Sequence, residues 1–229
     1  MLIHPAEARR RFRELAAGEI TNANLAEGAL LIALEEYPQL DVEESLQQLD
    51  ALAERVLRRG GEGEPPVFRL GHLHAEMFDA DGYTGDDDSY YDPRNAYLNE
   101  VIERKLGLPI ALSIVFLHVA ERVGLTAFGV GLPGHYLVKV QFELNEVYVD
   151  PFRGGTTLTM PEIAELLHQV SGGQVKLASE HLRSSTGRQT LIRLLANLQN
   201  MWGRRGETRK ANAARERIEI LQETTSGVA

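Results

Sequence analysis

A histidine and an aspartate stand where a nucleophilic triad would place its base and its orienting acid. His135 follows the Gly-Leu-Pro-Gly segment 131–134 and opens an alternating apolar run, and Asp150 closes the next such run. In a triad the aspartate orients the imidazole, which takes the proton of the nucleophile. The nucleophile is therefore the residue to look for.

No cysteine occurs anywhere in the chain, which excludes a thiolate nucleophile, a disulfide and a thiolate metal site. Ser113 is the candidate hydroxyl nucleophile, but it lies about one turn inside a predicted helix, away from the N-terminal amides that would form an oxyanion hole. The alternative is a small residue that lets the sheet approach the helix, with its hydroxyl bonded to the carbonyl one turn back.

The elements that must position these residues are predicted by hydrophobic spacing. Segment 109–123 is apolar nearly all round, which indicates a buried helix, and Pro109 suits its first turn. Three strand-like runs follow it, TAFGVGL, HYLVKVQF and EVYVDPF. Asn145 predicts a hairpin between the last two, so His135 and Asp150 are expected on neighbouring strands.

Helices are predicted on both sides of this core. Asp41 with Glu44, and Thr159 with Glu162, have the spacing of a capping box and predict two helix starts. One face of the last segment should be buried, because its apolar residues repeat at helical spacing: Leu191, Leu194, Leu195, Leu198 and Trp202. We expect a helical region over 1–64, a core over 65–182 and a helical tail over 183–229.

Composition narrows the class of protein. The chain has 229 residues, 43% of them apolar, and a net charge of −9, so a large core can form and no basic stripe predicts nucleic-acid binding. Its longest apolar run, 109–120, is too short to span a bilayer, and the N-terminus lacks the apolar core of a signal peptide. We expect a soluble, cytoplasmic protein that binds neither a membrane nor a cofactor.

An acidic loop, DADGYTGDDDSYYD, resembles a calcium site in composition alone. Setting Gly82 at the glycine position of an EF-hand puts Met77 where the first ligand should be. Four histidines, His72, His74, His118 and His168, show no ligand spacing. We therefore expect no metal site.

A buried helix followed by an antiparallel sheet with His and Asp on adjacent strands is the order of papain-like and transglutaminase-like folds. Three stretches resemble the transglutaminase-like proteins described as regulators of SirC expression, or SirB-type proteins: YYDPRNAYLNEVIERKLGLPIALSIVFLHVAERVGL, GVGLPGHYLVKV and VDPFRGG. The similarity covers residues 23–222. It implies an α+β fold with a helical N-terminal region, a degenerate transglutaminase-like (papain-like) core and a tetratricopeptide-like (TPR-like) helix pair at the C-terminus.

The resemblance also implies roles for residues. His135 falls on the family's histidine and Asp150 on its aspartate, while its cysteine position falls near Pro109 or Ile110, neither of which is a nucleophile. The remaining members of the predicted binding cleft come from the family-specific stretch before the buried helix: Asn95, Tyr97, Asn99 and Glu100.

Simpler readings stay open for several of these residues. Asn95 could be an ordinary helix N-cap, and Glu100 with Arg104 a surface ion pair one turn apart. His135 and Asp150 could be a hydrogen-bonded pair that ties two strands together, since buried polar groups are normally satisfied.

The sequence thus predicts a non-catalytic protein that binds another protein or peptide as an interaction or regulatory module. The alternative is a hydrolase or acyl-transfer enzyme in which His135 and Asp150 activate a water or serine nucleophile. The sequence leaves the oligomeric state open.

Overall fold

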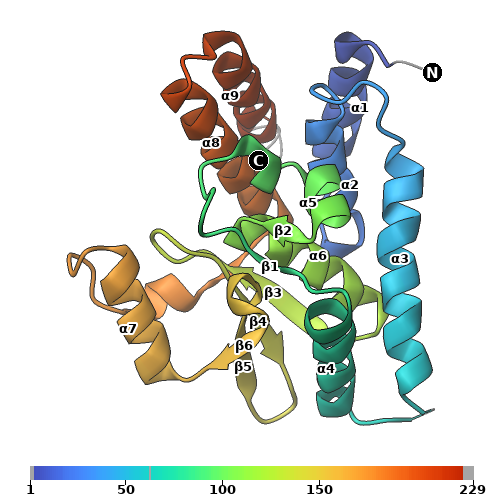
Figure 1. Cartoon of the computed structure of the whole chain (residues 1–229), viewed down its shortest axis with the longest axis vertical. Coiled ribbons are helices and arrows are strands. Elements are labelled where there is room, and N and C mark those ends of the chain that lie inside the picture. The colour runs from blue at the N-terminus through green and yellow to red at the C-terminus, as the bar shows by residue number, and fades with distance from the viewer. Residues whose placement is uncertain (1–2, 62, 224–229) are drawn as a thin grey trace.

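The computed structural model describes residues 3–61 and 63–223 of the chain. The N-terminal part is helical and forms one side of the molecule (Figure 1). Its helices are α1 (Pro5–Ala17), α2 (Asn22–Ala33), α3 (Val42–Arg59) and α4 (Pro66–His74), the last continuing into a π-helical turn over Ala75–Ala80. As predicted, Asp41 caps α3, where its side chain accepts a hydrogen bond from the Glu44 amide at 3.1 Å.

An antiparallel sheet of five strands forms the β part of the fold, in the order β6-β5-β4-β3-β7. The strands are β3 (Thr126–Val130), β4 (Leu137–Gln141), β5 (Glu146–Asp150), β6 (Thr156–Leu158) and β7 (Ser184–Ser185). β4 and β5 make the predicted hairpin, closed where the Phe142 amide donates to the Asn145 carbonyl at 2.8 Å. A short parallel pair, β1 (Thr84–Gly85) and β2 (Leu106–Gly107), lies apart from this sheet.

Helix α6 (Pro109–Arg122) occupies the centre of the molecule. Every residue from Pro109 to Ala120 is buried, which confirms the helix predicted from its apolar circumference. It packs against α2 and α3 on one side and against β3 and β4 on the other. The fold is therefore α+β, with a buried helix against an antiparallel sheet.

Two further helices border the core. Short α5 (Leu98–Arg104) precedes α6, and α7 (Met160–Val170) follows β6 on the far side of the molecule from α3 (Figure 1). The start of α7 is the predicted capping box, because the Glu162 carboxylate accepts from the amide and hydroxyl of Thr159 at 2.7 and 2.6 Å.

The tail is a helical hairpin of α8 (Gly187–Arg204) and α9 (Thr208–Glu223), which lies beside α1 and α2 (Figure 1). The four leucines of the predicted face are 0–2% exposed, and Trp202 is half-buried with its indole N–H donating to the Tyr97 hydroxyl at 2.9 Å. One hydrophobic cluster contains residues from the N-terminal helices, α6, the sheet and the tail. The division at residues 64 and 182 stays a prediction.

Within residues 3–61 and 63–223, no helix combines the length and the apolar character that a bilayer crossing requires.

A buried histidine on α6 should make stability depend on pH. His118 Nε2 lies 2.8 Å from Asp50 Oδ1, and burial lowers the pKa of His118 below its usual 6.5 although the Asp50 carboxylate opposes this. Between the lowered folded pKa and 6.5 the unfolded chain binds more protons, so the free energy of unfolding should fall as pH falls through that window. Denaturant unfolding at about pH 7.5 and about pH 5.5 measures the loss.

The matched variants are His118→Gln, which cannot titrate, and His168→Gln on the exposed side of α7. The loss between the two pH values should shrink in His118→Gln and persist in His168→Gln. An equal loss in both variants would assign the pH dependence to other groups. Asp50 does not confuse the test, because its pKa is lowered from 3.8 and lies below the window.

Candidate functional site

His135 and Asp150 are in direct contact in the structure. The Nε2 atom of His135 lies 3.0 and 2.9 Å from the two carboxylate oxygens of Asp150, and the side chains are 6% and 0% exposed. Asp150 Oδ1 also accepts from the Phe152 amide at 3.0 Å. With Nε2 held by the carboxylate, Nδ1 is the ring nitrogen left to receive a proton or a ligand group.

The hairpin explains why the two residues meet. Val138 pairs with Val149 in the antiparallel ladder, so the start of β4 and the end of β5 lie at the same end of the hairpin. Asp150 is the last residue of β5, whereas His135 lies two residues before β4, in a turn rather than on the strand itself. Gly134 supplies the positive φ of 78° that this turn requires.

An arginine of the tail fixes this turn. The guanidinium of Arg193 on α8 donates to the carbonyl oxygen of His135 at 2.7 Å and to that of Leu132. Burial lowers the pKa of Arg193. The contact spans 58 positions of sequence, and no local pattern indicated it.

A cleft of about 590 Å³ opens beside His135. Its lining comes from the acidic loop, the start of α6, the turn at His135, the segment after β5, α7 and α8. The lining residues that carry the argument below are Tyr91, Pro109, Ile110, Asn197, Asn200 and Met201. None of the lining residues within the described part of the chain is a serine, a threonine or a cysteine.

Ser113 lies away from this cleft. It is fully buried in α6, and its hydroxyl donates to the Pro109 carbonyl at 2.8 Å. This is the arrangement of a small residue bonded one turn back in its helix, which was the alternative to a nucleophile.

Asn95 has a structural setting different from the expected helix cap. It ends a short 3₁₀ turn (Pro93–Asn95), is fully buried, and its amide donates to Asp86 Oδ2 at 3.1 Å and to the Ser89 carbonyl at 2.8 Å. Arg104 donates to Asn95 Oδ1 at 3.0 Å and so is engaged here, away from the expected pairing with Glu100. Asn95 therefore ties the acidic loop to α5.

Tyr97, Asn99 and Glu100 point to other parts of the molecule. Tyr97 is the N-cap of α5, and its ring meets that of Tyr37 at 5.4 Å between centroids. Burial, followed by the negative charge of Glu100, raises the pKa of Tyr37. Asn99 Oδ1 is buried without a hydrogen-bond partner among the described residues.

The structure thus corrects the expectation that these four residues share a cleft with His135. Asn95, Tyr97, Asn99 and Glu100 are absent from the lining of the His135 cleft, although all four are described. Their place in the family-specific stretch did not bring them to the cleft, because α5 begins only at Leu98 and the Tyr97 hydroxyl accepts from Trp202 of the tail. The missed wall residues, Arg193, Asn197 and Asn200, come from α8 instead.

Comparison with known proteins agrees with this architecture. Residues 43–196 match the transglutaminase-like superfamily. A UPF0162 protein of Xylella fastidiosa (strain 9a5c) is 33% identical over 210 residues, which cover 90% of this chain and 75% of that protein. A UPF0162 protein of Pseudomonas aeruginosa is 29% identical over 194 residues, covering 85% and 70%.

More distant similarity extends to animals. Mouse F-box only protein 21 is 26% identical over 154 residues, which cover 56% of this chain and 25% of that protein. No solved structure gave a significant match.

Proposed function

The chain belongs to the transglutaminase-like superfamily, and from this premise we propose that it is a non-catalytic member whose cleft beside His135 binds another protein or peptide. The observation that carries the proposal is that the histidine and the position of the missing cysteine line the same cleft. His135 lines it together with Pro109 and Ile110 at the start of α6, where the resemblance locates the family's cysteine. A proline and an isoleucine have no group that could attack a carbonyl.

The chemistry of the cleft wall supports a peptide-like ligand. Its volume of about 590 Å³ lies within the usual range of ligand pockets, roughly 300–1,000 Å³. Ile110 and Met201 offer apolar surface, and the side-chain amides of Asn197 and Asn200 offer both donors and acceptors. A peptide presents the matching combination of apolar side chains and backbone polar groups.

A second candidate is a hydrolase or acyl-transfer enzyme in which His135 activates a water molecule or a hydroxyl. The bond from Nε2 to Asp150 favours it, because it leaves Nδ1 as a base in a lined cleft. Against it stands the lack of a serine, threonine or cysteine among the described lining residues.

The wider role we propose is regulatory and cytoplasmic. The resemblance to regulators of SirC expression fits a protein that acts by binding a partner, since regulation by association needs no turnover. The motifs that carry this resemblance include α5, α6 and the His135 turn. Residues of α6 and of this turn line the cleft.

Site-specific photo-crosslinking tests the binding proposal. Benzoylphenylalanine replaces Tyr91, which lines the cleft and is 51% exposed, and in a control protein it replaces Leu144, which is 98% exposed on the β4–β5 turn. After irradiation in a lysate of the source organism, mass spectrometry should find a specific product at position 91 that is missing at position 144.

A cleft-filling variant provides the decisive comparison. Asn200 is exposed and lines the cleft, so Asn200→Trp should fill the cleft without unfolding the protein and should suppress the product at position 91. Identical products at positions 91 and 144, or a product at 91 that survives Asn200→Trp, would contradict binding in this cleft.

A further inference from the structure

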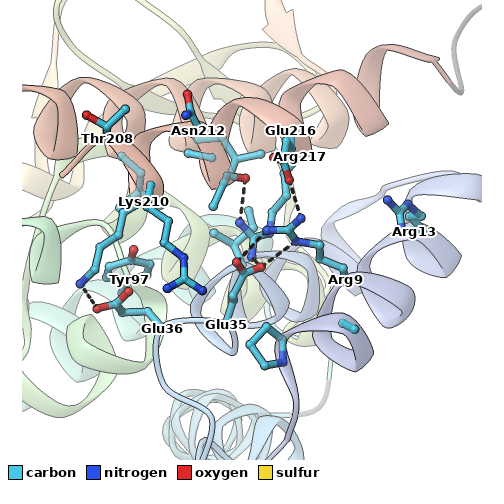
Figure 2. A pocket seen from close by; sticks show the side chains of 18 residues that line it. Arg9, Arg13, Glu35, Glu36, Tyr97, Thr208, Lys210, Asn212, Glu216 and Arg217 are labelled. Atoms are coloured by element: carbon cyan, nitrogen blue, oxygen red, sulfur yellow. Dashed lines mark hydrogen bonds and ion pairs between the residues drawn. The ribbon is translucent and has the colours of Figure 1, made fainter.

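A second recess lies where the first and last helices meet (Figure 2). It has a volume of about 1,020 Å³ and is bordered by α1, the end of α2, α8 and α9. We call it the α1–α9 groove. Ionisable side chains that line it are Arg9, Arg13, Glu35, Glu36, Tyr97, Arg209, Lys210, Glu216 and Arg217.

Three carboxylates in the groove are already neutralised. Glu35 accepts from Arg9 Nε and Nη2 at 3.0 and 2.9 Å, and it also pairs with Arg217 from α9. Arg9 makes a further ion pair with Glu216. Glu36 pairs with Lys210, as the dashed lines in Figure 2 show.

Two arginines remain without such partners. Arg13 on α1 and Arg209 on α9 are exposed and have no ion pair among the residues that the structure describes. The groove therefore has five basic and three acidic side chains, an excess of two positive charges. This is the reverse of the whole chain, whose net charge is −9.

Arg217 adds a buried cationic wall. It is 4% exposed, it pairs with Glu35 and donates to the Ala213 carbonyl at 3.0 Å, but its Nε has no acceptor within the described residues. Glu35 and Glu216 together neutralise Arg9 and Arg217, so the two excess positive charges of the groove belong to Arg13 and Arg209. A recess that concentrates positive charge in this way attracts anions from solution.

Neutral donors complete the lining. Thr208 and Asn212, in the first turns of α9, also line the groove, and their side chains point away from the Arg9–Glu35 cluster (Figure 2). The N-terminal end of a helix adds a partial positive charge. Guanidinium groups with hydroxyl and amide donors are the groups that proteins use for phosphate and carboxylate oxygens.

We propose that the α1–α9 groove binds a small, multiply charged anion that carries phosphoryl or carboxylate groups, held by Arg13, Arg209 and the wall at Arg217. Because Arg13 is on α1 and Arg209 on α9, the ligand bridges the N-terminal helices and the tail. The site is separate from the His135 cleft, with which it shares no lining residue.

Isothermal titration calorimetry with sodium tripolyphosphate and with sodium citrate tests the proposal, each against sodium chloride at matched ionic strength. The double variant Arg13→Gln/Arg209→Gln should bind at least about tenfold more weakly, since it loses two charge-assisted hydrogen bonds. Arg183→Gln is the matched control, because Arg183 is exposed and lies outside the groove. It should bind like the wild type.

The two probes identify the chemistry of the ligand. Tighter binding of tripolyphosphate assigns phosphoryl groups, and tighter binding of citrate assigns carboxylates. Heats no larger than those of sodium chloride for both probes, or equal binding by the double variant, would overturn the proposal. Both arginines are exposed, so the double variant should keep its melting temperature; if it does not, the two single variants replace it.

Discussion

A protein that ends at residue 186 should fail to fold cooperatively. The truncation removes the leucine face of α8, whose four leucines are 0–2% exposed, and exposes the core surface that they cover. Each fully buried leucine contributes roughly 1.5–3 kcal/mol, so four account for roughly 6–12 kcal/mol, comparable with the roughly 5–15 kcal/mol that stabilises a typical domain. We expect aggregation or a strongly lowered melting temperature, measured by light scattering and calorimetry.

A point variant makes the same test without removing chain. Leu194→Ala should cost about 2–5 kcal/mol because it leaves a cavity in a packed core. Leu144→Ala, the same chemical change at a residue that is 98% exposed, should cost close to nothing. A truncated protein that stays soluble with an unchanged melting temperature would show that the tail is a tethered, independent module.

The second large effect is the loss of stability expected when His135 or Asp150 is replaced. His135→Ala leaves the fully buried Asp150 carboxylate with fewer partners, and Asp150→Ala leaves the imidazole without its acceptor. An unsatisfied buried polar group costs about 1–3 kcal/mol, so each single variant should be destabilised. The double variant should lose less than the sum, with a coupling energy of roughly 0.5–3 kcal/mol.

Denaturant unfolding of the four proteins measures this coupling. Asp150→Ala combined with Leu144→Ala is the control, because Leu144 is 98% exposed in the β4–β5 turn, at the opposite end of the hairpin from Asp150, and the two effects should add. Near-zero effects for both single variants would place His135 and Asp150 in solvent and out of contact. That result would contradict the geometry described here.

Much of the fold could be predicted because its signals are local. A helix that is apolar all round must be buried, which identified α6, and the capping residues Asp41 and Thr159 marked helix starts. Two alternating runs joined by a short polar turn fixed β4 and β5 as a hairpin, and the hairpin alone brings His135 to Asp150.

The walls of the site could not be predicted, because they depend on packing between distant segments. Arg193 reaches the His135 turn only after α8 has docked on the core, and nothing in the spacing of α8 distinguishes Arg193 from a surface residue. Tyr97 misled the prediction for a related reason. Its place in the family-specific stretch suggested the cleft, but Tyr97 precedes α5 and its hydroxyl bonds to Trp202 of the tail.

The central claim is that the His135 cleft binds without turning over a substrate. The most direct test is an assay of the purified wild-type protein with glutamine-containing peptides and an amine for transamidation, and with ester and amide substrates for hydrolysis. The boiled protein and His135→Ala are the controls. We predict product formation no faster than in the boiled protein. Turnover above that background that disappears in a folded His135→Ala protein would contradict the claim and make His135 a catalytic base.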